Sequence, residues 1–294
     1  MVIGERLSIR FACPKAEIHT RNGRKMFKFK LNIMGRVTAA AIAVLTVACV
    51  VSLVTLGIRG LRPELYEKQE ALESVSSEAA LGATWDFGEN YVGSMVFLCD
   101  NTLSTMSEVE GLSESVALPT VWSDEEGHLL LGASISKTEI LFPEAERTAY
   151  VTDAVAEMKP DYLLITVGLE NGVRYCTEEQ FKAYYNSLVT AIKEASPTTK
   201  IILNSILPVS KNYERNTKGI SMDKINAANG WIVSIAEEQD VRYLHSISAL
   251  KDSDGYLDQK YDFGDGLHLN ADGYNALFNY IRTHGYMQKA SPEE

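Results

Sequence analysis

The sequence predicts an α/β domain with a parallel sheet, preceded by one transmembrane helix and a basic N-terminal segment. Three observations support this fold class. Short apolar runs alternate with amphipathic stretches after residue 93, an uncharged apolar segment lies nearer the N-terminus, and basic residues crowd before that segment. The chain has 294 residues, of which 46% are hydrophobic and 23% charged, so it is long enough for one such domain and ordinary in composition.

Charge is divided unevenly along the chain. Residues 1–36 contain nine Lys or Arg and two acidic residues, whereas the remainder contains 19 basic and 37 acidic residues. We interpret 1–36 as a basic head on the cytoplasmic side. The acidic remainder should repel nucleic acid and anionic lipid headgroups, so no nucleic-acid partner is expected, and solubility is the simplest reason for its acidity.

Residues 37–58 predict the membrane anchor. These 22 residues carry no charge, and as a helix they cross about 30 Å of hydrocarbon. The positive-inside rule keeps the basic head in the cytoplasm and exports the C-terminal part, giving a single-pass cell-membrane protein with an extracellular domain. A buried core helix, a cleaved signal peptide and a lipoprotein signal ending at Cys49 are the alternatives.

The rest of the chain divides into three parts. Residues 59–92 read as a juxtamembrane linker, 93–287 as the α/β domain and 288–294 as a tail. Apolar runs predict strands at 94–99, 162–167, 200–206 and 241–244. Helical spacing predicts helices at 145–158, 178–195, 222–239 and 271–284. Residues 111–142 are less regular and suggest a hairpin over one sheet edge.

The cysteines predict no metal site. Cys13, Cys49, Cys99 and Cys176 show neither a CxxC motif nor a Cys/His spacing. Only Cys99 and Cys176 belong to the predicted domain, and the sequence leaves open whether they pair. No dinucleotide or phosphate-binding fingerprint is present, so no cofactor is implied and a phosphate-binding flavodoxin-like protein has little support.

Polar residues follow the predicted strands at three places, where a parallel sheet displays its binding groups. They are the turn at 99–102, the glycine-flanked loop at 168–172 and the turn at 264–270. In the last of these, Asp265 and His268 have the spacing of a carboxylate that orients a catalytic imidazole. A capping Asp beside a surface His is the structural alternative.

These blocks together resemble the SGNH/GDSL hydrolases, in particular a bacterial membrane-anchored subgroup. The likeness extends over about 190 residues through VFLCDNT, KPDYLLITVG, the loop from Gly168 to Asn171, and FGDGLHLN followed by ADGY. It implies a three-layer α/β/α, flavodoxin-like fold. It also implies hydrolysis of O-acyl or O-acetyl esters on a surface glycan or lipid, with an acylated carbohydrate or small ester as ligand.

The resemblance implies a role for each matching residue. His268 would be the general base and Asp265 would orient it. Asn171, in the block that begins at Gly168, would donate its amide to the oxyanion, together with the backbone N–H of residue 101. Asp100 would hold the turn.

The nucleophile is the main departure from the family pattern. The Gly-Asp-Ser of the family reads Cys99-Asp100-Asn101 here, and a carboxamide does not form an acyl-enzyme in the normal way. The loop from Gly168 to Asn171 is also one residue longer than in the subgroup. The family's separate oxyanion glycine has two candidates, Gly127 and Gly132.

The substitution leaves several functions open. Cys99, Thr102 and Ser104 are alternative nucleophiles, and His268 could also activate water directly. Two hypotheses about function therefore stay open. The protein is either a weakly active esterase or a non-catalytic module that binds a glycan or ester at the former catalytic site.

Overall fold

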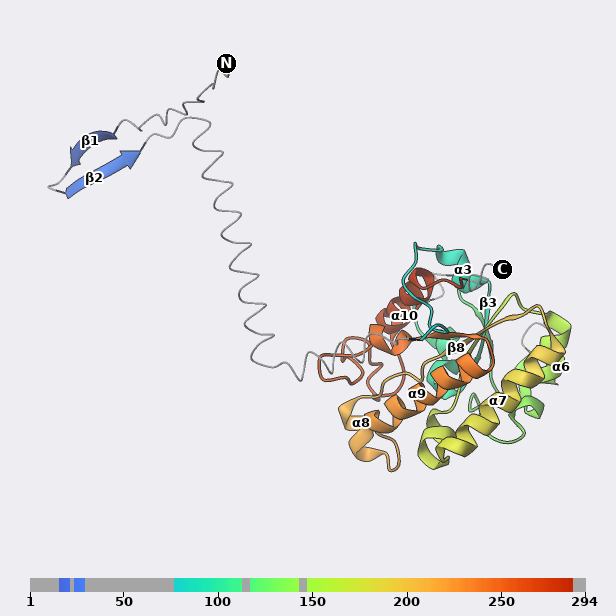
Figure 1. Cartoon of the computed structure of the whole chain (residues 1–294). Coiled ribbons are helices and arrows are strands. Elements are labelled where there is room, and N and C mark those ends of the chain that lie inside the picture. The colour runs from blue at the N-terminus through green and yellow to red at the C-terminus, as the bar shows by residue number, and fades with distance from the viewer. Residues whose placement is uncertain (1–15, 22–23, 30–76, 113–116, 143–146, 288–294) are drawn as a thin grey trace, which may run out of the picture. The chain divides into compact units, whose positions relative to one another are not determined.

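The computed structural model describes residues 16–21, 24–29, 77–112, 117–142 and 147–287 (Figure 1). The chain forms two compact units, Met1–Ala71 and Leu72–Glu294. Within the first unit, β1 (Ala16–Arg21) pairs with β2 (Arg24–Phe29) as an antiparallel hairpin. The basic segment predicted at 1–36 therefore contains a hairpin that the sequence analysis did not anticipate.

The second unit is built on a five-stranded parallel sheet. Its strands lie in the order β4-β3-β7-β8-β9, and every neighbouring pair is parallel. Their bounds are β3 Met95–Cys99, β4 Thr120–Trp122, β7 Tyr162–Thr166, β8 Lys200–Asn204 and β9 Arg242–Leu244. Counted along the chain this order is 2-1-3-4-5, the flavodoxin-like doubly wound order, which confirms the α/β part of the predicted fold class, a domain with a parallel sheet.

Helices cover both faces of this sheet. One face packs against α6 (Val151–Met158), α7 (Glu178–Ala195) and α9 (Met222–Glu238), and the other against α3 (Glu89–Gly93), α4 (Asn101–Ser104) and α10 (Ala271–Thr283). Strand β3 shows the division most clearly. Val96 and Leu98 join the first core, whereas Met95, Phe97 and Cys99 join the second, because successive side chains of a strand point to opposite faces.

Local sequence signals explain where the long helices begin. Thr177 and Gln180 form a reciprocal capping box at the start of α7, and Ser221 caps α9. The predicted helices at 178–195, 222–239 and 271–284 match α7, α9 and α10 to within a residue. A short helix, α8 (Lys211–Asn216), begins at the Ser210 cap.

In the middle of the chain, one predicted helix begins later than expected and the predicted hairpin is only partly confirmed. The helix predicted at 145–158 begins only at Val151, because residues Arg147–Tyr150 form strand β6 and pair antiparallel with β5 (Glu139–Phe142). Residues 111–142 supply one arm of that hairpin. They also supply β4, a parallel edge strand that the sequence analysis missed.

The α/β domain also begins earlier than predicted. Residues 77–92 were assigned to the linker, yet Ala79 and Leu81 exchange backbone hydrogen bonds with Tyr243 of β9 at 2.9 and 2.8 Å. Ala79 is fully buried and Leu81 nearly so. This segment therefore extends the sheet edge beyond β9 and is part of the folded unit.

The predicted anchor at 37–58 lies outside the described residues. Among the residues that the structure does describe, no helix is both long and apolar enough to cross a membrane. Cys99 and Cys176 are both free thiols, so they form no disulfide.

Candidate active site

A buried carboxylate holds the turn that follows β3. Asp100 is 3% exposed and caps α4, where its Oδ1 accepts from the backbone N–H and the hydroxyl of Thr102 at 3.2 and 2.7 Å. Its Oδ2 accepts from the N–H groups of Gly168 and Leu169 at 3.0 and 3.2 Å. Burial raises the pKa of Asp100, against the opposing effect of these hydrogen bonds. Asp100 thus ties the end of β3 to the end of β7, at the point where the strand order reverses.

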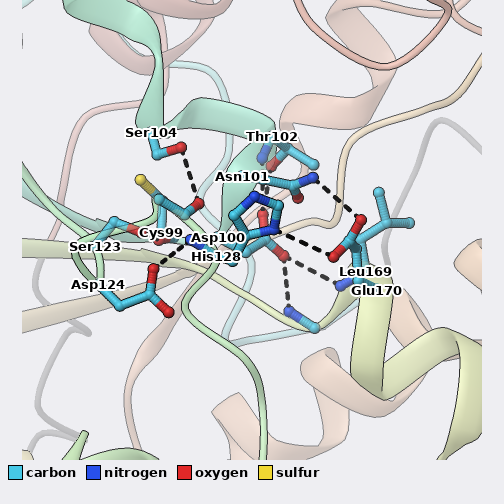
Figure 2. A network of polar contacts seen from close by, with 12 residues as sticks. Cys99, Asp100, Asn101, Thr102, Ser104, Ser123, Asp124, His128, Leu169 and Glu170 are labelled. Atoms are coloured by element: carbon cyan, nitrogen blue, oxygen red, sulfur yellow. Dashed lines mark hydrogen bonds and ion pairs between the residues drawn. The ribbon is translucent and has the colours of Figure 1, made fainter. Parts of the chain in front are cut away.

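Asn101 stands beside an acidic side chain at this junction. Its Nδ2 donates to Glu170 Oε1 at 3.3 Å, and His128 Nδ1 lies 3.6 Å from Glu170 Oε2 (Figure 2). Asn101 is 8% exposed, and its Oδ1 is buried with no hydrogen-bond partner. We call these three side chains the 101–128–170 cluster.

The conformation of the wide turn after β7 determines which side chain contacts Asn101. Gly168 has a φ of 113°, in the left-handed region that favours glycine, and a Cβ there would lie 3.1 Å from Phe181. The turn Leu169–Val173 closes with a π-type hydrogen bond from Val173 N–H to Gly168 O at 2.8 Å. Through this turn Glu170 faces Asn101.

The two expected donors of this loop are already engaged. Asn171 Nδ2 donates to the carbonyl of Leu131 at 2.6 Å, and the Gly168 N–H donates to Asp100. The oxyanion role of Asn171 and Gly168 remains a prediction, and the residue that the structure brings to position 101 is Glu170. In the sequence, only the extra residue in this loop indicated that a side chain other than Asn171 would contact position 101.

The second turn holds the predicted base–orienter pair. His268 Nδ1 lies 2.5 Å from Asp265 Oδ2, and Asp265 Oδ1 accepts from the N–H groups of Leu267 and His268, each at 2.9 Å. Burial alone would raise the pKa of Asp265, but the hydrogen bonds from His268 and Leu267 outweigh it and lower the pKa. The Nδ1 contact fixes the ring and leaves Nε2 as the nitrogen available to act as a base.

Tyr213 connects the two turns electrostatically. Burial raises the pKa of its hydroxyl, and the carboxylates of Glu170 and Asp265 both add to the shift. Its helix, α8, packs on the second turn, since Ser210 N–H donates to Gly266 O at 2.8 Å and Gly266 leaves no room for a side chain there.

The three alternative nucleophiles lie in different environments. Cys99 is fully buried, and burial, with Asp100 adding, raises the pKa of its thiol well above the usual value, so the reactive thiolate is disfavoured. The hydroxyl of Thr102 is buried and donates to Asp100. Ser104 Oγ donates to the carbonyl of Gly127 at 3.0 Å.

A hollow of about 540 Å³ lies beside the first turn. Ser104, Ser123, Asp124 and Glu126 are among its lining residues, whereas Asn101, Glu170 and His268 are not. Of the alternative nucleophiles, Ser104 is the one that borders this hollow.

Sequence reasoning missed Glu170 and His128. His128 lies in a loop and Glu170 in the π-type turn after β7, and neither belongs to a motif whose spacing predicts that the two side chains meet. His128 is carried to the cluster by a tight turn in which Asp124 accepts its backbone N–H.

The site thus combines a capped turn at the switch point of a parallel doubly wound sheet with a hydrogen-bonded Asp–His pair in a second turn. The GDSL-like Lipase/Acylhydrolase family matches residues 113–276, more than half of the chain. The chain therefore belongs to this family. The matched range contains Glu170, Asp265 and His268 and begins after Asn101, so the assignment of Asn101 to the nucleophile position rests on the resemblance of its turn.

Solved structures give further matches at low identity. A candidate platelet activating factor from Streptococcus pneumonia is 18% identical, with a TM-score of 0.45 over 80% of this chain and 97% of that chain. A GDSL-like lipase from Bacteroides thetaiotaomicron VPI-5482 is 15% identical, with a TM-score of 0.45 over 64% and 84%.

A third match is the periplasmic domain of a lipopolysaccharide acetyltransferase from Salmonella ser. Paratyphi A. It is 16% identical, with a TM-score of 0.42 over 74% of this chain and 93% of that chain. No curated protein matches the sequence. The family membership thus rests on the sequence match.

Proposed function

We propose that this protein is a membrane-anchored, extracellular acylhydrolase-family protein whose ester hydrolysis is impaired by the loss of the nucleophilic serine. The observation that carries the proposal is the contrast within the site. Asp265 and His268 form a hydrogen-bonded pair at 2.5 Å, while position 101 holds an Asn bonded to Glu170. The pair would supply the base, whereas the side chain at position 101 has no hydroxyl for it to activate.

The remaining activity would be slow and would depend on His268. With no hydroxyl at position 101, His268 Nε2 would take a proton from water, and the hydroxide would attack the acyl carbon directly. Triad enzymes that lack a member keep a residual rate from binding and oxyanion contacts. Here the carboxylate of Glu170 lies beside position 101, so it would oppose the negative charge of the oxyanion.

The family activity and the predicted anchor together suggest the substrate. An exported domain tethered at 37–58 would act on O-acyl or O-acetyl groups of a surface glycan or lipid. The N-terminus would stay in the cytoplasm and the α/β domain would be extracellular.

A second function is a binding module without turnover. Two contacts favour it: Asn101 Nδ2 donates to Glu170, and Asn171 Nδ2 donates to Leu131. Both amides donate to acceptors within the protein, so neither is available to stabilise an oxyanion. Such a site would bind a glycan or ester without hydrolysing it.

Hydrolysis of a small activated acetyl ester tests the proposal. We would compare the full-length protein with Asn101→Ser and His268→Ala, and check the folding of each by circular dichroism. We expect a low rate for the natural protein, a rate at least about 100-fold higher for Asn101→Ser, and loss of activity in His268→Ala. A complete absence of turnover in the natural protein, with gain in Asn101→Ser, would select the binding module. A folded Asn101→Ser protein without activity would refute an ester-hydrolase site.

A further inference from the structure

Phe263 is paired directly with His268 across a short hairpin. Asp262 and Leu269 form an isolated antiparallel bridge, so the next pair toward the turn is Phe263 with His268. The Phe263 N–H donates to the carbonyl of His268 at 2.9 Å. Residues that lie directly opposite in an antiparallel pair carry their side chains on the same face, with Cβ atoms about 5 Å apart. This register therefore sets the ring of Phe263 beside the imidazole of His268.

The turn between the two residues holds this arrangement in place. Asp262 Oδ1 accepts from the N–H groups of Gly264 and Gly266 at 2.7 and 2.9 Å. Gly264 and Gly266 have φ values of 118° and 82°, in the left-handed region that favours glycine. The hairpin that presents Phe263 is thus fixed by its own hydrogen bonds before a ligand arrives.

The fold itself makes little use of the Phe263 ring. Phe263 is 66% exposed and belongs to neither of the two cores of the described α/β unit. A single exposed apolar residue is ordinary on a protein surface. This one, however, lies beside the residue that would act as the base, so its ring is available to contact the substrate.

The surroundings of the ring suit a sugar better than an acyl chain. An acyl chain needs a concave apolar pocket that covers most of it, and the hollow of about 540 Å³ includes neither Phe263 nor His268 among its lining residues. An open ring offers one flat apolar face. A pyranose has a matching C–H face, which the negative face of an aromatic ring attracts, and hydroxyls around its edge. The side chain of Asp265, 46% exposed beside His268, can accept from such a hydroxyl.

We propose that Phe263 binds the C–H face of a pyranose ring that carries the acyl ester, and that it directs the protein toward O-acylated carbohydrates rather than lipids. That the ligand is an ester rests on the proposed function. The position of the ring rests on the hairpin register, which does not depend on the residue at position 101.

Saturation-transfer difference NMR on the full-length protein in detergent tests this inference. The probes are methyl 6-O-acetyl-β-D-glucopyranoside and glyceryl monobutyrate, a soluble ester with a longer acyl chain and no sugar ring. Phe263→Ala removes the aromatic ring and Phe263→Tyr keeps it. The matched control is Trp85→Ala, since Trp85 is 68% exposed. The residue before it, Thr84, is bonded to Thr283 at the end of α10 that lies opposite to His268.

We expect saturation of the aromatic protein protons to reach the C–H protons of one sugar face, and Phe263→Ala to weaken binding of the sugar acetate roughly tenfold. Phe263→Tyr and Trp85→Ala should change this affinity by less than about twofold. Glyceryl monobutyrate should bind no better to the natural protein than to Phe263→Ala. Circular dichroism checks the folding of each variant.

Four results would each overturn the inference. They are no binding of the sugar acetate, an unchanged affinity in Phe263→Ala, an equal loss in Trp85→Ala, and an equal loss for both esters in Phe263→Ala. The last result would mean that the ring contacts an acyl chain instead of a sugar.

The binding measurement requires no turnover, so it separates this inference from the proposed function. If Asn101→Ser hydrolyses the acetyl ester and Phe263→Ala binds the sugar acetate as well as the natural protein does, only the role of Phe263 is refuted. If Phe263→Ala loses affinity and Asn101→Ser is silent, the ester-hydrolase site is refuted and the sugar contact stands.

Discussion

The two turns of the candidate site present different side chains. At 264–270, the imidazole of His268 and the carboxylate of Asp265 are hydrogen-bonded, and Asp265 also accepts two backbone N–H groups. At 99–102, Asp100 accepts three backbone N–H groups and the hydroxyl of Thr102, and the side chain at position 101 is an amide facing Glu170. Both turns are held by a carboxylate that accepts backbone N–H groups, and they differ in the side chains that they present.

The shape of the first turn depends on the buried Asp100. Under the proposed function, its reactivity depends on different residues, Asn101 and Glu170. The predictions below test that separation, beginning with the largest expected effect.

The two aspartates should contribute very differently to stability. Asp100→Ala leaves buried N–H groups of Thr102, Gly168 and Leu169 without acceptors, and we expect it to lower the free energy of unfolding by about 3–4 kcal/mol. Asp265→Ala, at a partly exposed turn, should cost less than about 1 kcal/mol. Urea unfolding of both variants measures the difference, and equal costs would contradict the separation.

Removing the charge of Glu170 should increase the activity that a serine restores. In the Asn101→Ser protein, Glu170→Gln replaces a carboxylate beside the oxyanion by a neutral amide, and we expect kcat to rise about 10-fold to 100-fold. The measurement is acetyl-ester hydrolysis, with Glu194→Gln in the same background as the charge control. A decrease in kcat would mean that Glu170 assists the reaction.

Truncating Asn171 distinguishes a structural amide from an oxyanion donor. Its Nδ2 is bonded to the Leu131 carbonyl, so in the Asn101→Ser background we expect Asn171→Ala to change kcat by less than about 3-fold. An oxyanion donor would instead cost about 100-fold or more. Such a loss would support the role that the family resemblance implies.

The pH dependence of Asp265 should be small and of defined sign. Because its pKa is lowered in the folded protein, its contribution to stability is present above the ordinary Asp value of about 3.9 and is lost as pH falls through the lowered value. At pH 6, the free energy of unfolding of the natural protein should exceed that of Asp265→Asn by less than about 1 kcal/mol. This difference should shrink when urea unfolding is measured at pH 3. A difference that grows as pH falls would contradict this sign.

Most of the fold could be predicted because its signals are local. Residues Glu178–Ala195 carry a capping box and an apolar face, and the residues of β3, β7 and β8 form continuous apolar runs between turn residues. Strand β4 was missed because Thr120–Trp122 is too short to show a period. The hairpin arm Arg147–Tyr150 was read as helix because it precedes a true helix without a breaker.

The site was predictable in part for the same reason. Asp265 and His268 are three residues apart, so their contact follows from the sequence spacing. The contact between Asn101 and Glu170 joins residues far apart in sequence, and it depends on a π-type turn and on the φ of Gly168. No local pattern encodes which side of such a turn faces the neighbouring strand end.

Labelling with a fluorophosphonate tests most directly whether the site lacks only its nucleophile. An activated serine hydroxyl at position 101 would attack phosphorus and release fluoride, and intact-protein mass spectrometry would detect the adduct. We predict no adduct on the natural protein, one adduct on residue 101 in Asn101→Ser, and none when His268→Ala is added. An adduct on another residue of the natural protein, or a folded Asn101→Ser protein that stays unlabelled, would contradict the account.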